Sequence, residues 1–466
     1  MTCQMITRLG FNFIIGAGGR ALLATATFFG MTLIANLSFA QLTSQVLIGD
    51  SVSEAGKKFP DIDEAIKRFG NRDYLGARQF LESAKRSDPT LPPADLILAK
   101  MYFLTGDVAA GRMSLEKTVM DNSGDPEAYL ILADQAAQPA QNRTIEAEAL
   151  YEKALQLTDS FKENAKRKRN FDIRAHSGRA FVSERRKNWQ KAVEDLQAML
   201  KTDPDNAAGH YRLGRALFMM KKYKEGYDEF VASKKLDKEK AIPNPYVSAA
   251  SMYDALNMPN EAKQAFDLAI KEDGKNIGTL TSYAQWLIKT GKAEDAAKVL
   301  AEARKIDPNS LDVLTLSGVA ARMSKQLKPA EDYFVAALAI APSNGGVINQ
   351  LALLLVDQPD DDKRRRALEF AGINARLNDK SADAQVTYAW VLFQLQRLAE
   401  AQEALRMGIR LGNLGQDSSY LVAKMISDQN VDAAKRLLTD ALESDNPGIF
   451  VNRREAQELL DSLNKK

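Results

Sequence analysis

The sequence predicts an all-α fold of about eleven helix hairpins, and two observations support this prediction. A pattern of small and bulky apolar residues recurs about every 34 residues along the chain. Two consecutive copies are Ala296, Leu300, Ala303, Pro308 and then Ala330, Phe334, Ala337, Pro342. The spacing i, i+4, i+7 places the first three residues of each copy on one face of a helix. A fixed repeat of this length indicates stacked helix pairs with a continuous core.

The small residue near the start of each second helix marks the hairpins in chain order. These residues are Ala77, Gly111, Ala147, Ala192, Gly226, Ala262, Ala296, Ala330, Ala367, Ala401 and Ala434. A small side chain lets the two helices of a hairpin touch, and the bulkier residue four positions later fills the space beside it. We therefore expect hairpins over residues 61–446, with prolines such as Pro308 ending second helices.

These residues resemble the tetratricopeptide repeat (TPR) family. Leu213-Gly214 followed by Tyr223 is similar to the family's first helix, and the run from Ala330 to Pro342 is similar to its second helix. The resemblance covers about residues 59–446, although the second and ninth units depart from the pattern at Gly111, Thr118, Ala371 and Asn374. It implies a right-handed α-solenoid whose first helices line a concave groove for a protein or peptide.

The first 40 residues have the composition of a secretory signal peptide. They contain Arg8 and Arg20 but no acid, then an apolar run at 21–34, and small residues before Gln41. We expect cleavage after Ala40 and export to the periplasm or the extracellular space, followed by a linker at 41–60. An uncleaved membrane anchor remains an alternative, and only in that case do we expect membrane attachment. Cys3, the single cysteine, lies in the segment to be removed.

The charge of the chain is balanced except in one insertion. The sequence has 63 basic and 61 acidic residues, so a nucleic-acid partner is not expected. The step from the third to the fourth unit is 45 residues, and the extra residues are expected to lengthen the fourth unit's first helix. Residues 161–187 carry ten bases against three acids, including Lys166, Arg167, Lys168, Arg169, Arg185, Arg186 and Lys187. They could bind an anionic polymer or surface, or pair with acids of neighbouring repeats.

The groove implied by the resemblance would be lined mainly by aromatic residues. The candidate partner-binding residues are Phe181, Tyr211, Arg215, Phe218, Trp390 and Phe393. Aromatic and arginine side chains often dominate the energy of protein interfaces. The alternative for each of them is packing between helices. The paired lysine and asparagine with which some family members clamp a peptide carboxylate are absent at the matching positions.

Catalytic chemistry is not expected. His176 and His210 lie one repeat apart at a position that holds packing residues elsewhere, so we predict neither a catalytic set nor a metal site. No glycine-rich phosphate loop follows a strand, and no cofactor is predicted. We expect a non-catalytic scaffold for protein–protein interaction in the cell envelope. Binding of an anionic polymer or surface through 161–187 is the alternative function.

The C-terminal segment is predicted to close the array. Asn446-Pro447-Gly448 interrupts the helical pattern, and residues 447–466 then contain one more amphipathic helix. Its apolar face carries Ala456, Leu459, Leu460 and Leu463. Because a solenoid must cover its last hydrophobic face, we expect this helix to act as a cap.

Overall fold

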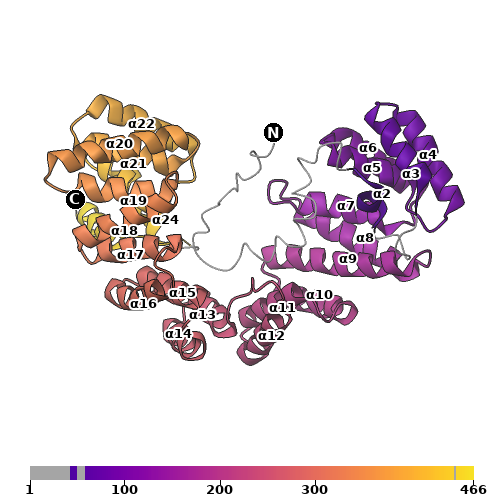
Figure 1. Ribbon diagram of the computed structural model, residues 1–466, viewed down its shortest axis with the longest axis horizontal. Coiled ribbons are helices and arrows are strands. Elements are labelled where there is room, and N and C mark those ends of the chain that lie inside the picture. Colours follow the sequence, from indigo (N-terminus) through magenta and orange to yellow (C-terminus); the bar gives the residue numbers. More distant parts are fainter. Residues whose placement is uncertain (1–41, 50–57, 445–447, 466) are drawn as a thin grey trace, which may run out of the picture. The chain divides into compact units, whose positions relative to one another are not determined.

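The computed structural model describes residues 42–49, 58–444 and 448–465, and all regular secondary structure in these ranges is helical (Figure 1). The predicted signal peptide at 1–40 lies outside the described residues. The chain divides into two compact units, with the boundary between Ala262 and Lys263. The predicted all-α class is therefore confirmed, and each unit is described by itself below.

The first unit contains one short helix and then helices that alternate as first and second members of hairpins. They are α2 (Ser44–Ile48), α3 (Pro60–Gly70), α4 (Tyr74–Ser87), α5 (Ala94–Leu104), α6 (Val108–Asp121), α7 (Pro126–Ala137), α8 (Thr144–Ser160), α9 (Ala165–Arg185), α10 (Trp189–Thr202), α11 (Ala207–Met219), α12 (Tyr223–Leu236) and α13 (Pro245–Ala255). α3 packs on α4, α5 on α6, and so on to α11 on α12.

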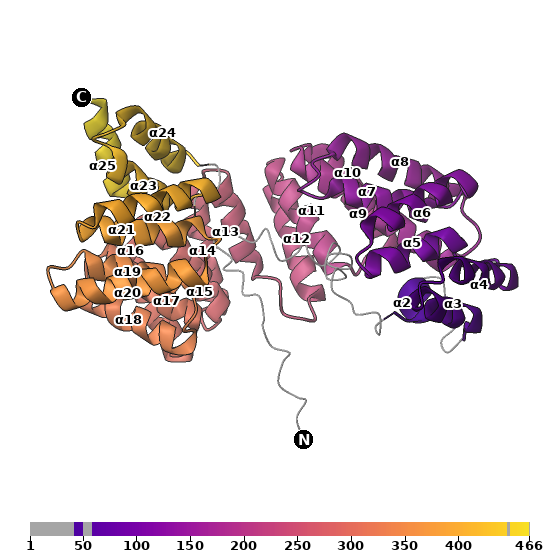
Figure 2. The same cartoon turned by 90° about the horizontal axis from the view of Figure 1, so that it is seen from above.

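The second unit continues the alternation. Its helices are α15 (Ile277–Lys289), α16 (Ala293–Ile306), α17 (Leu311–Met323), α18 (Leu327–Ile340), α19 (Gly345–Val356), α20 (Asp361–Leu377), α21 (Ala382–Gln394), α22 (Leu398–Leu411), α23 (Gln416–Ile426), α24 (Val431–Leu442) and α25 (Arg453–Asn464). α14 (Pro259–Asp273) begins before the boundary and ends after it. Figure 2 shows the helices of this unit from a second direction, and α15 packs on α16, α17 on α18, and so on to α23 on α24. Five complete hairpins therefore lie in the described part of each unit.

The small-bulky-small pattern is buried where the hairpins close. Ala330, Phe334 and Ala337 are each 0% exposed. The turn before α16 contains Gly291 at φ +78°, a left-handed conformation that glycine adopts without a steric penalty. In the α11–α12 hairpin, Gly214 and Gly226 face each other so closely that a Cβ on either would lie 2.8 Å from the other's carbonyl oxygen. The repeated small residues thus permit backbone-to-backbone contact.

Replacing Gly214 with alanine should destabilise the protein by about 1–2 kcal/mol. Overpacking costs about 1–3 kcal/mol, and alanine's better helix propensity returns part of that cost. Chemical denaturation of the variant beside Gly124→Ala provides the test, because a Cβ at Gly124 meets nothing within 4 Å. Equal stability of the two variants would contradict the close-approach explanation.

The insertion of the fourth unit lengthens α9, as predicted. α9 has 21 residues, whereas the first helices α11 and α13 have 13 and 11. The additional turns begin at Asn164, whose side chain accepts a hydrogen bond from the Arg167 backbone N–H at 3.0 Å. Asparagine is favoured at this position because it satisfies a helix N–H that lacks an intrahelical partner.

The predicted cap is confirmed, because α25 packs against α24 and α23. Phe450, Ala456 and Leu463 are at most 5% exposed. Asp417 of α23 accepts hydrogen bonds from the backbone N–H groups of Val451 at 3.1 Å and Asn452 at 2.9 Å. One carboxylate therefore holds the start of the segment that covers the last hairpin.

The predicted linker at 41–60 is wrong in its described part. Residues 44–48 form α2, and Leu47 and Ile48 are both 1% exposed. α2 has only five residues, too few for a periodic pattern to predict a helix. It is buried because it packs against α3 and α5. None of the described helices is long and apolar enough to cross a membrane.

Candidate functional site

The first helices of neighbouring hairpins pack against one another and form a continuous surface, which we call the first-helix face. In the second unit, α17 contacts α19, α19 contacts α21, and α21 contacts α23. Side-chain contacts there join α17 to α19 and α21 to α23. The residues in these contacts are Arg322 on α17, Gln350 on α19, Trp390 on α21, and Tyr420 and Lys424 on α23.

Two contacts order this part of the second unit. Arg322 Nη1 donates a hydrogen bond to Gln350 Oε1 at 2.6 Å. The exposed Lys424 ammonium lies 5.0 Å from the Trp390 ring centroid and 5.6 Å from that of Tyr420. A cation at this distance is attracted to the negative face of an aromatic ring. Lys424 lies 34 residues after Trp390, so the repeat register contained the signal for this pair.

Two carboxylates lie within electrostatic range of these cations. The surrounding protein raises the pKa of Asp357 by desolvation, and the charges of Arg322 and Lys424 counteract the rise. Burial likewise raises the pKa of Asp417, again against the charge of Arg322. This face therefore offers cations and the Asp357 carboxylate to a partner, with the Trp390 ring buried beneath Lys424. Apart from Trp390, none of these residues was predicted from the sequence.

Three of the predicted groove residues are buried in the core. Tyr211, Phe218 and Trp390 are 4%, 1% and 3% exposed. Tyr211 and Phe218 pack against Phe230 of α12, with ring centroids 5.3 and 5.4 Å apart. The packing alternative therefore describes these three residues. Aromatic rings of neighbouring helices enclose Tyr211 and Phe218, and Trp390 lies beneath Lys424 of α23.

The other three predicted groove residues are half-buried. Phe181 lies under the Arg185 guanidinium, 5.9 Å from ring centroid to Cζ. Burial raises the pKa of Tyr211, and the nearby charge of Arg215 partly offsets this rise. Phe393 stacks on Trp390 at 5.8 Å. Their role toward a partner remains a prediction, with Phe181 and Arg215 in the first unit and Phe393 in the second.

The basic residues of 161–187 largely pair within the protein. Arg169 binds Asp203 at 3.0 Å, Arg174 donates to Asp134 at 2.8 Å, and Arg186 pairs with Glu148. Three others donate to backbone carbonyls: Lys166 to Gly49, Lys168 to Asp159 and Arg185 to Ala137. Lys187 is exposed. Most bases of this segment therefore have a partner within the protein, and Arg174 and Arg186 pair with acids of the preceding hairpin, as the second interpretation has it.

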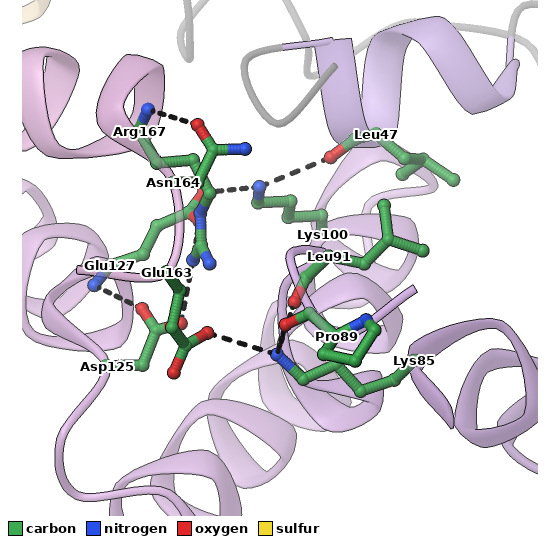
Figure 3. Close-up of polar contacts among 10 residues, drawn as sticks. All are labelled: Leu47, Lys85, Pro89, Leu91, Lys100, Asp125, Glu127, Glu163, Asn164 and Arg167. Atoms are coloured by element: carbon green, nitrogen blue, oxygen red, sulfur yellow. Dashed lines mark hydrogen bonds and ion pairs between the residues drawn. The ribbon is translucent and has the colours of Figure 1, made fainter. Parts of the chain in front are cut away.

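Arg167 belongs to a buried ion cluster rather than to a surface patch (Figure 3). It is 1% exposed and donates from Nη2 to Asp125 at 2.7 Å and to Glu127 at 2.9 Å. The rings of Phe161 and Phe171 flank the guanidinium, with centroids 5.2 and 5.0 Å from Cζ. The prediction of Arg167 as an accessible base is therefore wrong.

The cluster continues to Lys100 on α5, which forms an ion pair with Glu127. Burial favours the neutral form of Glu127, but Lys100 and Arg167 outweigh it and lower the pKa to about 2. Asp125 shows the opposite direction, because burial and the nearby Glu127 charge raise its pKa despite Arg167. The two carboxylates therefore respond in opposite directions to the same buried environment. Lys100 also donates to the Leu47 carbonyl oxygen of α2 at 3.2 Å (Figure 3).

The two histidines make the same contact in adjacent hairpins. His176 Nδ1 lies 2.9 Å from Asp195 Oδ1, and His210 Nδ1 lies 2.5 Å from Glu229 Oε2. In both cases a first-helix imidazole meets an acid of the second helix. Within the described residues, no group of three or more His, Cys, Asp or Glu side chains is arranged to hold a metal.

Sequence comparison places tetratricopeptide repeats in this chain. A family model described as "Tetratricopeptide repeat" matches residues 179–231, from within α9 to within α12. The chain is also similar to the TPR repeat-containing protein YpiA of Bacillus subtilis (strain 168), with 24% identity over 258 residues. That match covers 54% of this chain, and the chain spans 55% of the length of this relative.

Three solved structures are also similar. The crystal structure of yeast Tom70 has 17% identity and a TM-score of 0.39, and the match covers 87% of this chain and 95% of that one. The crystal structure of MamA has 18% identity and a TM-score of 0.31, over 35% and 93% of the chains. YrrB, described as a TPR protein with an unusual peptide-binding site, has 16% identity and a TM-score of 0.24, over 50% and 95%.

Proposed function

This chain belongs to the tetratricopeptide-repeat family, and from that premise we propose that it is a non-catalytic scaffold that binds a protein partner in the cell envelope. The observation that supports this most directly is the first-helix face of the second unit. There Lys424 is exposed above the buried Trp390, Arg322 and Gln350 lie on α17 and α19, and Asp357 directly follows α19.

The chemistry of this face favours a polypeptide with charged side chains of both signs. Lys424 and Arg322 would pair with acids of the partner, and Asp357 with a base. Trp390 is buried and stacks on Phe393, so it gives the exposed Lys424 above it a rigid support. Rigid aromatic and charged anchors are typical energetic centres of interfaces.

The envelope location rests on the sequence of residues 1–40, which carries the basic start, the apolar run and the small residues of a signal peptide. Export to the periplasm or the extracellular space follows from that segment if it is cleaved. Sequencing of the mature N-terminus would test this part, and a chain that begins at Met1 in the cytoplasm would contradict it.

Charge reversal at Lys424 tests the scaffold. Capture of partners from the envelope fraction by the full mature chain should fall at least about tenfold in Lys424→Glu, because an acid would replace the exposed cation of the face. Lys298→Glu is the matched control, since Lys298 lies on the second helix α16 with a side chain that is 77% exposed. Equal capture by the two variants would contradict a partner site on this face.

Binding of an anionic polymer or surface through 161–187 is the less supported alternative. Arg167 is buried, and Arg169, Arg174 and Arg186 already pair with acids, so fewer cations remain for an external anion than the sequence indicates. Binding that disappears at high salt but is unaffected by Lys424→Glu would favour this alternative.

A further inference from the structure

A short N-terminal segment lies on the first-helix face of the first unit. It comprises residues 42–49, which include α2. Leu42, Leu47 and Ile48 are 7%, 1% and 1% exposed, whereas Val46 on the opposite side is 52% exposed. The segment is therefore amphipathic and buries nearly all of its apolar side.

The segment contacts first helices from several hairpins. α2 packs against α3 and α5, the first helices of the first two hairpins. Its apolar side chains share a core cluster with Ile97 and Met101 of α5. Lys166, at the start of α9 in the fourth hairpin, donates to the Gly49 carbonyl oxygen at 3.1 Å. The segment therefore lies on the first helices of the first two hairpins and is also held by the lengthened start of α9, which reaches back to it.

The polar contacts hold the C-terminal end of α2. Lys100 donates to the Leu47 carbonyl and Lys166 to that of Gly49. The last carbonyls of a helix lack intrahelical partners and form the negative end of its dipole, so cations stabilise them. Glu127 pairs with Lys100 and is held in turn by the buried Arg167, so the ion cluster orients the lysine toward α2 (Figure 3).

We propose that residues 42–49 are an internal ligand of the first unit, and that a partner presenting a short amphipathic segment of the same chemistry binds there by displacing it. That segment would carry apolar residues for the α3–α5 surface and would place carbonyl or carboxylate oxygens at Lys100 and Lys166. This inference rests on the proposed scaffold function. It adds a second binding surface, on the first unit, whose access residues 42–49 would regulate. A segment tethered by a short linker has an effective concentration of about millimolar, so it competes strongly with free partners.

The first test releases the internal segment in the full-length chain. Leu47→Asp/Ile48→Asp should weaken its docking, and a fluorescent peptide of residues 41–50 should then bind at least about tenfold more tightly than it binds the unchanged chain. Val46→Asp is the matched control, because Val46 faces away from the surface, and it should bind the peptide as weakly as the unchanged chain. Equal peptide binding by the double variant and by the control would overturn the proposal.

A second test does not depend on the double variant folding. A specific protease site introduced within residues 50–57 allows the segment to be cut from α3 after the protein has folded. We expect the labelled peptide to exchange with the cut segment, while circular dichroism of the remaining chain stays unchanged. A cut segment that never exchanges, or a chain that unfolds on its loss, would make 42–49 an integral part of the fold and overturn the proposal. Neither test uses an outside partner, so failure of the scaffold function would be seen separately in the Lys424→Glu capture.

Discussion

Replacing Arg167 with methionine is expected to lower the free energy of unfolding by about 3–5 kcal/mol. Methionine fills a similar volume between Phe161 and Phe171 but leaves Asp125 and Glu127 without their shared cation. Removal of one partner of a buried ion pair is costly because the remaining charge stays out of water. Urea denaturation followed by circular dichroism would measure the loss.

Arg169→Met is the matched control for this experiment. Arg169 is two residues away on the same helix, but its side chain is 56% exposed and its pair with Asp203 is on the surface. Exposed ion pairs contribute about 0–1 kcal/mol, so this variant should be nearly as stable as the unchanged protein. Similar losses in both variants would contradict the burial argument.

The difference between Arg167→Met and the unchanged protein should depend on pH. The folded-state pKa of Glu127 is about 2, below its ordinary value of 4.5, so the ionised group stabilises the fold above pH 4.5. This contribution is lost as the pH falls from 4.5 toward 2. The variant keeps Lys100 but loses the part of this contribution that Arg167 supplies, so its deficit should be larger near neutral pH than in acid. A deficit that is constant down to pH 3 would contradict the assignment to Glu127.

Deletion of residues 448–466 should destabilise the second unit by about 3–6 kcal/mol. Burial of a phenylalanine or leucine side chain contributes about 1.5–3 kcal/mol each, and the deletion removes Phe450 and Leu463 from the core. It also exposes the face of α24 that α25 covers. We expect a lower melting temperature and aggregation on heating.

Glu458→Ala provides the control for the deletion, because Glu458 is an exposed residue of the same helix. This substitution should leave the melting temperature unchanged. A truncated chain that stays soluble on heating and melts at the original temperature would show that α25 does not cap the array.

The site residues were predicted less well than the fold. Whether a side chain is exposed or paired depends on residues that are far away in the sequence. Tyr211 and Phe218 are aromatic residues of the kind that often contribute to interfaces. In this protein, however, the rings of Phe230 on α12 and Tyr253 on α13 pack against them. Arg174 and Arg167 belong to a basic run, yet the acids that neutralise them lie 40 to 42 residues earlier. A local count of charges cannot include such partners.

The sequence by itself determined the all-helical repeat, the long first helix of the fourth unit and the final cap. Those features follow from contacts within about one repeat, which small and bulky residues at fixed spacing record. Only the tertiary structure decided which aromatic and basic side chains are buried, and that residues 42–49 dock on the first unit. The lysines that hold this segment are 53 and 117 residues away from the carbonyls they bind, so no local pattern marks them.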